Sequence, residues 1–234
     1  MEALELHQSY LSWIFPAFLL IFGLVAFLRI FYPKHFADYQ NLLFNNKYIV
    51  IYGKKERRLH LFMTVLFLLQ CVCLALLFYV MLKNFGITEL YNSQFMFLEL
   101  VLIVFSLLIT KLLLQQWISS LFDLYDFARD YIFTRVSYSS YAAIVMVILL
   151  FLGVYIPFAN KNQLFLLLFV LVSILLAINV LGWIKIIKNN QKEIKPYLFY
   201  FILYLCTLEI APYIFLIYGT KYLIEVQKMA QFVS

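Results

Sequence analysis

Charge is scarce in this sequence. Asp, Glu, Lys and Arg together make up 13% of its 234 residues, about half the share found in soluble domains, while apolar residues make up 65%. A water-soluble chain of this length could not bury so much apolar surface, so a soluble catalytic domain is excluded. The composition instead predicts one membrane domain, residues 1–234, whose apolar segments are joined by short connectors.

Residue types that build metal and redox sites are also few. Cys71, Cys73 and Cys206 all lie inside apolar runs and lack the spacing of a disulfide framework or a metal site. The three histidines lie far apart, with no pair one helical turn apart that could hold a metal on a helix. A glycine-rich phosphate loop and a serine elbow are absent as well. We therefore expect no metal, no cofactor and no enzyme activity.

Glycine is the third scarce residue type. The six glycines include no pair at the four-residue spacing that lets transmembrane helices approach closely. The 25 phenylalanines make the packing bulky, so much helix surface should face lipid or partner proteins. This composition also argues against a tightly gated transporter, whose binding site usually relies on helices broken by Gly or Pro.

Six apolar runs are each long enough to cross a bilayer, which takes about 20 helical residues. They predict an all-α fold, a polytopic integral membrane helical bundle with six transmembrane helices. The runs are 10–31, 59–82, 95–122, 137–158, 163–187 and 196–222. No positively charged segment precedes the first run, so we expect an uncleaved span and not a secretory signal.

The basic cytoplasmic connector 33–58 is the longest polar segment between spans. Apolar residues recur in it at helical spacing, which predicts a short amphipathic helix lying in the membrane interface between the first and second spans. These residues are Phe36, Tyr39, Leu42 and Leu43. The run 48–52 that follows is rich in β-prone residues.

A basic cluster ends this connector. It consists of Lys54, Lys55, Arg57 and Arg58. Such a cluster beside a span usually marks the cytoplasmic face and contacts anionic phospholipid headgroups, and docking of an acidic partner is the alternative. We expect no nucleic-acid binding, because the Lys and Arg residues cluster beside apolar runs and form no continuous polar face.

The Lys and Arg distribution predicts the topology. Connectors one–two, three–four and five–six carry thirteen of these residues, the opposite side carries four, and Lys111 lies inside a span. The four are Lys83, Lys161, Lys221 and Lys228. Since positive residues accumulate on the cytoplasmic side, both termini should be periplasmic.

Two charged residues lie inside apolar runs at a comparable depth. Lys111 is in the third run, and Glu209 is in the sixth, with Pro212 one turn later as a helix break. A lone charge in hydrocarbon costs several kcal/mol, so the two should pair or face a watery cavity. One reading is a structural ion pair; the other is a proton or substrate relay whose polar path would include Gln70 and Asn179.

One acidic string is similar to a known enzyme pattern. Asp123, Asp126 and Asp130 resemble the clustered aspartates with which membrane CDP-alcohol phosphotransferases bind divalent metals. The glycine of that pattern is missing, and no Asp follows Asp130 to form a second cluster. A solvated acidic helix face that pairs with nearby arginines is the simpler interpretation.

Two short segments resemble an uncharacterised family, a domain of unknown function, of multi-pass bacterial inner-membrane proteins. They are Leu-Cys-Thr-Leu-Glu-Ile-Ala-Pro at 205–212, and Thr110-Lys111 followed by Trp117 and Leu121-Phe122. The resemblance implies the gliding flavobacterial lineage, a gene often encoded beside uroporphyrinogen-III synthase, and a cytoplasmic-membrane location, but no established activity. It favours Lys111, Glu209 and Pro212 as candidates because they fall on its recognisable positions.

Two functional hypotheses follow. The first is a non-enzymatic inner-membrane accessory or scaffold subunit that binds other membrane proteins through apolar helix faces. The second is a small proton-coupled transporter that uses the intramembrane Glu–Lys pair. The scarcity of polar residues that could line a pore favours the first.

Overall fold

Every element that the structure describes is a helix. The computed structural model describes residues 2–45, 47–52, 58–84, 95–121, 125–155, 161–189 and 218. Its helices are α1 (Glu2–Phe31), α2 (Pro33–Gln40), α3 (Lys47–Tyr52), α4 (Arg58–Asn84), α5 (Met96–Leu121), α6 (Tyr125–Tyr155) and α7 (Lys161–Asn189). These residues contain no strand, so the predicted all-α class is confirmed.

Five of these helices are long and apolar enough to cross a membrane. The candidate spans are Ile14–Phe31, Leu61–Lys83, Met96–Trp117, Arg129–Tyr155 and Leu166–Ile186. They correspond to the first five predicted runs and identify a multi-pass membrane protein. The sixth predicted run, 196–222, lies outside the described residues.

Two helices differ from their sequence-based description. Residues 137–155 of the predicted fourth run, 137–158, and the preceding residues 125–136 form one continuous helix, α6. Residues 156–158 lie outside the described part of the chain. The β-prone run 48–52 is helical in α3, where Tyr48 and Ile49 are buried. Strand propensity mainly reflects how well side chains fit a half-buried surface. In α3 the same side chains find such a surface on the bundle while the backbone is helical.

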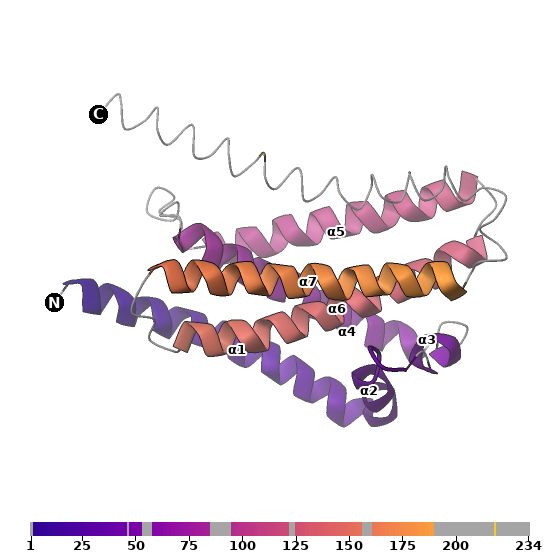
Figure 1. The fold of residues 1–234 in the computed structure, drawn as a ribbon, viewed down its shortest axis with the longest axis horizontal. Coiled ribbons are helices and arrows are strands. Elements are labelled where there is room, and N and C mark those ends of the chain that lie inside the picture. The colour runs from indigo at the N-terminus through magenta and orange to yellow at the C-terminus, as the bar shows by residue number, and fades with distance from the viewer. Residues whose placement is uncertain are drawn as a thin grey trace.

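Helices α4 and α6 form the centre of the bundle (Figure 1). Half of the α4 span and 56% of the α6 span are buried inside the structure, whereas only 6% of the α5 span is. Helix α7 packs against α6 at two glycines. A Cβ atom at Gly182 would lie 2.9 Å from Cγ of Tyr138, and one at Gly153 would lie 2.7 Å from the Leu167 side chain. Glycine is required at residue 182 for this close approach.

The short helices α2 and α3 lie beside the bundle, level with the ends of α5, α6 and α7 at which α7 finishes (Figure 1). The apolar stripe predicted for the connector is present in α2 and the turn after it. Phe36, Tyr39 and Leu42 of this stripe are buried, within the same core cluster as side chains of α4 and α6. The stripe therefore packs on protein.

Candidate functional site

The two buried amides predicted to line a polar path each belong to a helix–helix contact. Gln70 of α4 donates from Nε2 to Oγ of Ser139 over 2.7 Å, and Ser140 donates from its hydroxyl to Gln70 Oε1 over 3.3 Å. Gln70 is only 4% exposed. Because both ends of its amide are bonded to α6, the side chain links the two central helices, and neither end of this amide is left unpaired in the apolar core.

Asn179 belongs to the contact between α6 and α7. Its Nδ2 donates to the Leu175 carbonyl in its own helix over 2.8 Å, and its backbone carbonyl accepts a bond from Nη1 of Arg135 over 2.9 Å. The Arg135 guanidinium also lies 5.5 Å from the ring centroid of Trp183. A buried cation is thus held by a carbonyl oxygen and an aromatic face, both from α7.

The carboxyl end of α2 is bound by two side chains from the spanning helices. Tyr138 of α6 donates its hydroxyl to the Leu42 carbonyl over 3.1 Å. Lys185 of α7 donates to the carbonyls of Leu42 and Leu43 over 3.0 and 3.2 Å, and its ammonium lies 5.5 Å from the Tyr138 ring centroid. Carbonyls at a helix carboxyl end lack helical partners and carry partial negative charge, so a cation stabilises them.

Aromatic rings fill the space beneath α2 and α3. Tyr39 donates its hydroxyl to the Ser137 carbonyl over 3.3 Å. Its ring meets Tyr48 and Phe62 edge-on at centroid distances of 5.5 and 6.0 Å, and Tyr48 stacks on Phe133 at 5.6 Å. Burial raises the pKa of Tyr39 and of Tyr48 well above the ordinary tyrosine value, so both phenols are neutral at physiological pH.

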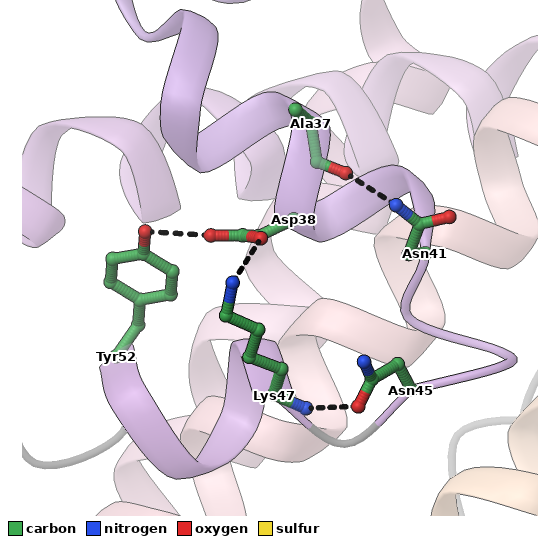
Figure 2. A network of polar contacts seen from close by, with 6 residues as sticks. All are labelled: Ala37, Asp38, Asn41, Asn45, Lys47 and Tyr52. Atoms are coloured by element: carbon green, nitrogen blue, oxygen red, sulfur yellow. Dashed lines mark hydrogen bonds and ion pairs between the residues drawn. The ribbon is translucent and has the colours of Figure 1, made fainter.

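On the outer side of the same segment, Asp38 connects α2 to α3 (Figure 2). Tyr52 donates its hydroxyl to Asp38 Oδ2 over 2.9 Å, and Nζ of Lys47 lies 3.7 Å from Oδ1. Burial, followed by the bond to Asp38 and its negative charge, raises the pKa of Tyr52. Asn45 accepts a bond from the Lys47 amide over 3.0 Å at the start of α3. These contacts hold α2, the turn and α3 together as one unit.

We call the residues that make the polar contacts among α2 with its following turn, α4, α6 and α7 the polar layer. It consists of Tyr39, Leu42, Gln70, Arg135, Tyr138, Ser139, Asn179 and Lys185. Residues 14–220, which include this layer, match the family described as Domain of unknown function (DUF4271). The chain belongs to the DUF4271 family. Searches of curated proteins and of solved structures found no match.

The DUF4271 match confirms that the chain belongs to an uncharacterised family, as the resemblance predicted. The match starts at the residue where the first candidate span, Ile14–Phe31, begins, and it continues past the last described span. It therefore contains all five candidate spans found among the described residues of this DUF4271 chain and both members of the predicted ion pair.

The structure describes only one of the two residues of the predicted ion pair. Lys111 is half-buried on α5, whereas Glu209 and Pro212 lie outside the described residues. Of the basic cluster, Lys54, Lys55 and Arg57 also lie outside them, and Arg58 begins α4 without a described side chain. The pair and the cluster stay predictions.

Sequence reasoning missed four members of the polar layer. In the sequence Arg135 and Lys185 are connector charges, and Tyr138 and Ser139 lie inside the fourth apolar run. Tyr131, Arg135 and Tyr138 recur at helical spacing, and that signal could have placed them on one face of α6. Gly182, opposite Tyr138, offered no signal of its own.

Gln115 of α5 is a buried polar side chain that does not belong to the polar layer. It is 5% exposed, and neither atom of its amide has a hydrogen-bond partner within the described part of the chain. An unsatisfied amide in an apolar environment costs a few kcal/mol, so a partner for it is expected.

Proposed function

We propose that this protein is a non-enzymatic accessory or scaffold subunit of a bacterial inner membrane that binds other membrane proteins through α5. The observation that carries this proposal is the exposure of the α5 span, of which only 6% is buried inside the structure. Lipid can cover such a face. One further feature of α5 favours a protein partner.

This feature is the composition of the exposed stripe of α5. Leu102 and Leu113 are 59% and 60% exposed, and Trp117 is 68% exposed. Ser106 and Thr110 lie between them on the same face at a spacing of one helical turn, and both are exposed. Small and hydroxyl-bearing residues allow close approach and hydrogen bonding between membrane helices, whereas lipid chains offer no hydrogen-bond partner.

The transporter hypothesis has less support. It requires the Gln70 and Asn179 side chains to face a common path. The Gln70 amide is instead bonded to Ser139 and Ser140 of α6, and the Asn179 amide donates to the Leu175 carbonyl within its own helix. We propose that Lys111 and Glu209 form a structural pair, with Pro212 bending the sixth span. This pair would fix which helices touch.

The finer placement of the protein is also a proposal. We infer six spans, an inner-membrane location in the gliding flavobacterial lineage, and both termini in the periplasm. The positive-inside distribution of Lys and Arg supports this orientation. In that orientation α2, α3 and the basic cluster lie at the cytoplasmic face, where the cluster contacts anionic phospholipids.

Site-specific photocrosslinking in native membranes tests the scaffold proposal. A crosslinking amino acid at Leu102 or Trp117 should give a discrete adduct with another membrane protein. The matched controls are Leu19 of α1 and Phe169 of α7, which are 61% and 68% exposed, and these should crosslink mainly to lipid. Ser106→Leu with Thr110→Leu should remove the adduct but leave the folded protein. Equal adducts at all four positions, or adducts only within this chain, would contradict the proposal.

A further inference from the structure

The surface of α3 that faces away from the bundle is apolar at three positions. Phe44, in the turn before α3, is 90% exposed, and Val50 and Ile51 are 63% and 41% exposed. Lys47 lies one turn from these two residues, with its side chain 58% exposed. We call Phe44, Lys47, Val50 and Ile51 the α3 outer face. Tyr48 and Ile49 point the other way and are buried.

The contacts of α2 with α6 set the depth of this face. The candidate span in α6, Arg129–Tyr155, has 27 residues, more than the roughly 20 needed to cross the hydrocarbon. Counting about 20 residues back from Tyr155 places the inner hydrocarbon edge near Val136. Leu42 is bonded to Tyr138, which lies at this edge or just inside it.

Helix α7 gives the same depth independently. Its candidate span, Leu166–Ile186, has 21 residues and therefore crosses the hydrocarbon with little to spare. Lys185, one residue before the end of that span, binds the Leu42 and Leu43 carbonyls. Figure 1 agrees, because α2 and α3 lie level with the end of α7 and do not project beyond it.

Charge near the α3 outer face has one predominant sign. Arg29, Lys34 and Lys47 are exposed in this part of the chain. Asp38, the acidic residue between Lys34 and Lys47, lies 3.7 Å from Lys47 Nζ, and the Lys47 side chain remains 58% exposed beside this ion pair. In the sequence the basic cluster follows α3 directly. An apolar face with cations beside it, at the depth of the headgroups, complements an anionic lipid surface.

We propose that the α3 outer face inserts into the inner leaflet and that Lys47 binds an anionic phospholipid headgroup there. The exposed apolar end of α1, with Ile30 at 72% and Phe31 at 64%, continues the lipid-facing surface of the first span toward this face. The bonds from Tyr138 and Lys185 fix α2 before lipid binds, so little ordering is needed on insertion. This inference rests on the proposed orientation and does not depend on the scaffold proposal.

A depth measurement in nanodiscs tests the insertion. An environment-sensitive fluorophore is attached to Phe44→Cys, and separately to Val50→Cys, in the full chain with its native cysteines replaced. Nitroxide on the lipid chains should quench both labels strongly, nearly as strongly as a label at Leu176 in the exposed middle of α7. A label at Arg129, which is exposed about seven residues beyond the hydrocarbon edge near Val136, should be quenched little. Labels at both test positions that behave like the one at Arg129 would overturn the proposal.

Headgroup selectivity is measured on the same samples. Nitroxide-labelled phosphatidylglycerol should quench the label at residue 44 at least about twofold more than nitroxide-labelled phosphatidylcholine, and Lys47→Gln should bring that ratio close to one. Arg129→Gln is the control and should leave the ratio unchanged. A ratio of one in the unmodified chain would overturn headgroup binding. Quenching in nanodiscs that disappears in native membranes would show that a protein covers this face, and would overturn lipid as its occupant.

Discussion

Helices α5 and α6 are both apolar enough to cross a bilayer, yet 6% of one span and 56% of the other are buried. The buried helix is the more polar of the two at its contacts, where Thr134, Arg135, Ser137 and Ser140 are inside. The exposed face of α5 carries leucines and a tryptophan, with the hydroxyls of Ser106 and Thr110 between them. Lipid is as apolar as leucine, so hydrophobicity does not draw membrane helices together. Polar bonds and small residues decide which surface becomes interior.

The largest expected effect comes from placing a large side chain at the close contact between α6 and α7. Gly182→Leu would place a Cβ 2.9 Å from Cγ and 3.0 Å from Cβ of Tyr138, atoms that cannot move without the α6 backbone. We expect loss of folded protein or destabilisation of about 3 kcal/mol, the upper end for overpacked cores. Fluorescence-detected size exclusion after heating measures the change.

The matched control for this substitution is Gly23→Leu. No atom lies within 4 Å of a Cβ built at Gly23, which is an exposed glycine of α1. The variant should fold as well as the unmodified chain. Equal losses at the two positions would mean that burial of α6 does not depend on its close contact with α7.

The second prediction concerns the charge on α5. Glu209→Gln and Lys111→Met should each lower the amount of folded protein, because each would leave a lone ion at a depth where this costs about 2.5 to 3.5 kcal/mol. The double variant should recover part of the loss. Membrane abundance and thermal stability are measured for all four chains of the cycle. Strictly additive losses would show that the two residues do not touch.

The third prediction isolates the attachment of α2. Lys185→Met removes two charge-assisted bonds to the Leu42 and Leu43 carbonyls, each worth about 1.5 kcal/mol or more. Hydrogen exchange of the amides in α2 and α3 should accelerate at least about tenfold, and exchange in α4 should change little. Lys188→Met, at an exposed residue of the same helix, is the control. Unchanged exchange in α2 would show that aromatic packing alone holds it.

The spans were predictable from sequence because each depends on a long apolar run, which a bilayer requires whatever the neighbours are. Accordingly, the runs 59–82 and 163–187 agree with α4 and α7 to within two residues at each end. The polar layer was not predictable, because it depends on which helices touch. In the sequence Arg135 is one of the charges of a connector, and only the structure shows that α6 is continuous through it. Lys185 is likewise one of the charges that predict topology, and only the structure shows that the turn after α2 lies beside it.

The fourth prediction concerns the bond between the two central helices. A double-mutant cycle of Gln70→Leu and Ser139→Ala should give a coupling free energy of about 0.6 kcal/mol, and no more than about 1.7, as for hydrogen bonds between other membrane helices. Reversible unfolding in mixed micelles measures it. Ser173→Ala is the control partner, because its hydroxyl bonds within α7 and should not couple to Gln70. A coupling free energy of zero would mean that only the bond to Ser140 contributes to the stability of the contact between Gln70 and α6.

The smallest expected effect is a change in pH dependence. Burial raises the pKa of the Tyr39 and Tyr48 phenols in the folded chain, whereas unfolding returns each to the ordinary value near 10. Above that pH the unfolded chain releases protons that the folded chain retains, so stability should be constant below about pH 10 and should fall as the pH rises further.

Phenylalanine at these two positions removes the groups responsible and separates their effect from that of the lysines. Tyr39→Phe and Tyr48→Phe should each make the fall in stability between about pH 10 and pH 11 less steep, while lysine ionisation contributes equally in all three chains. Absorbance of the phenolate gives a direct check, since the two phenols should ionise together with unfolding and not before it. Early ionisation of either phenol would mean that water reaches the space beneath α2. The closed interior around α6 would then not extend to the aromatic rings beneath α2.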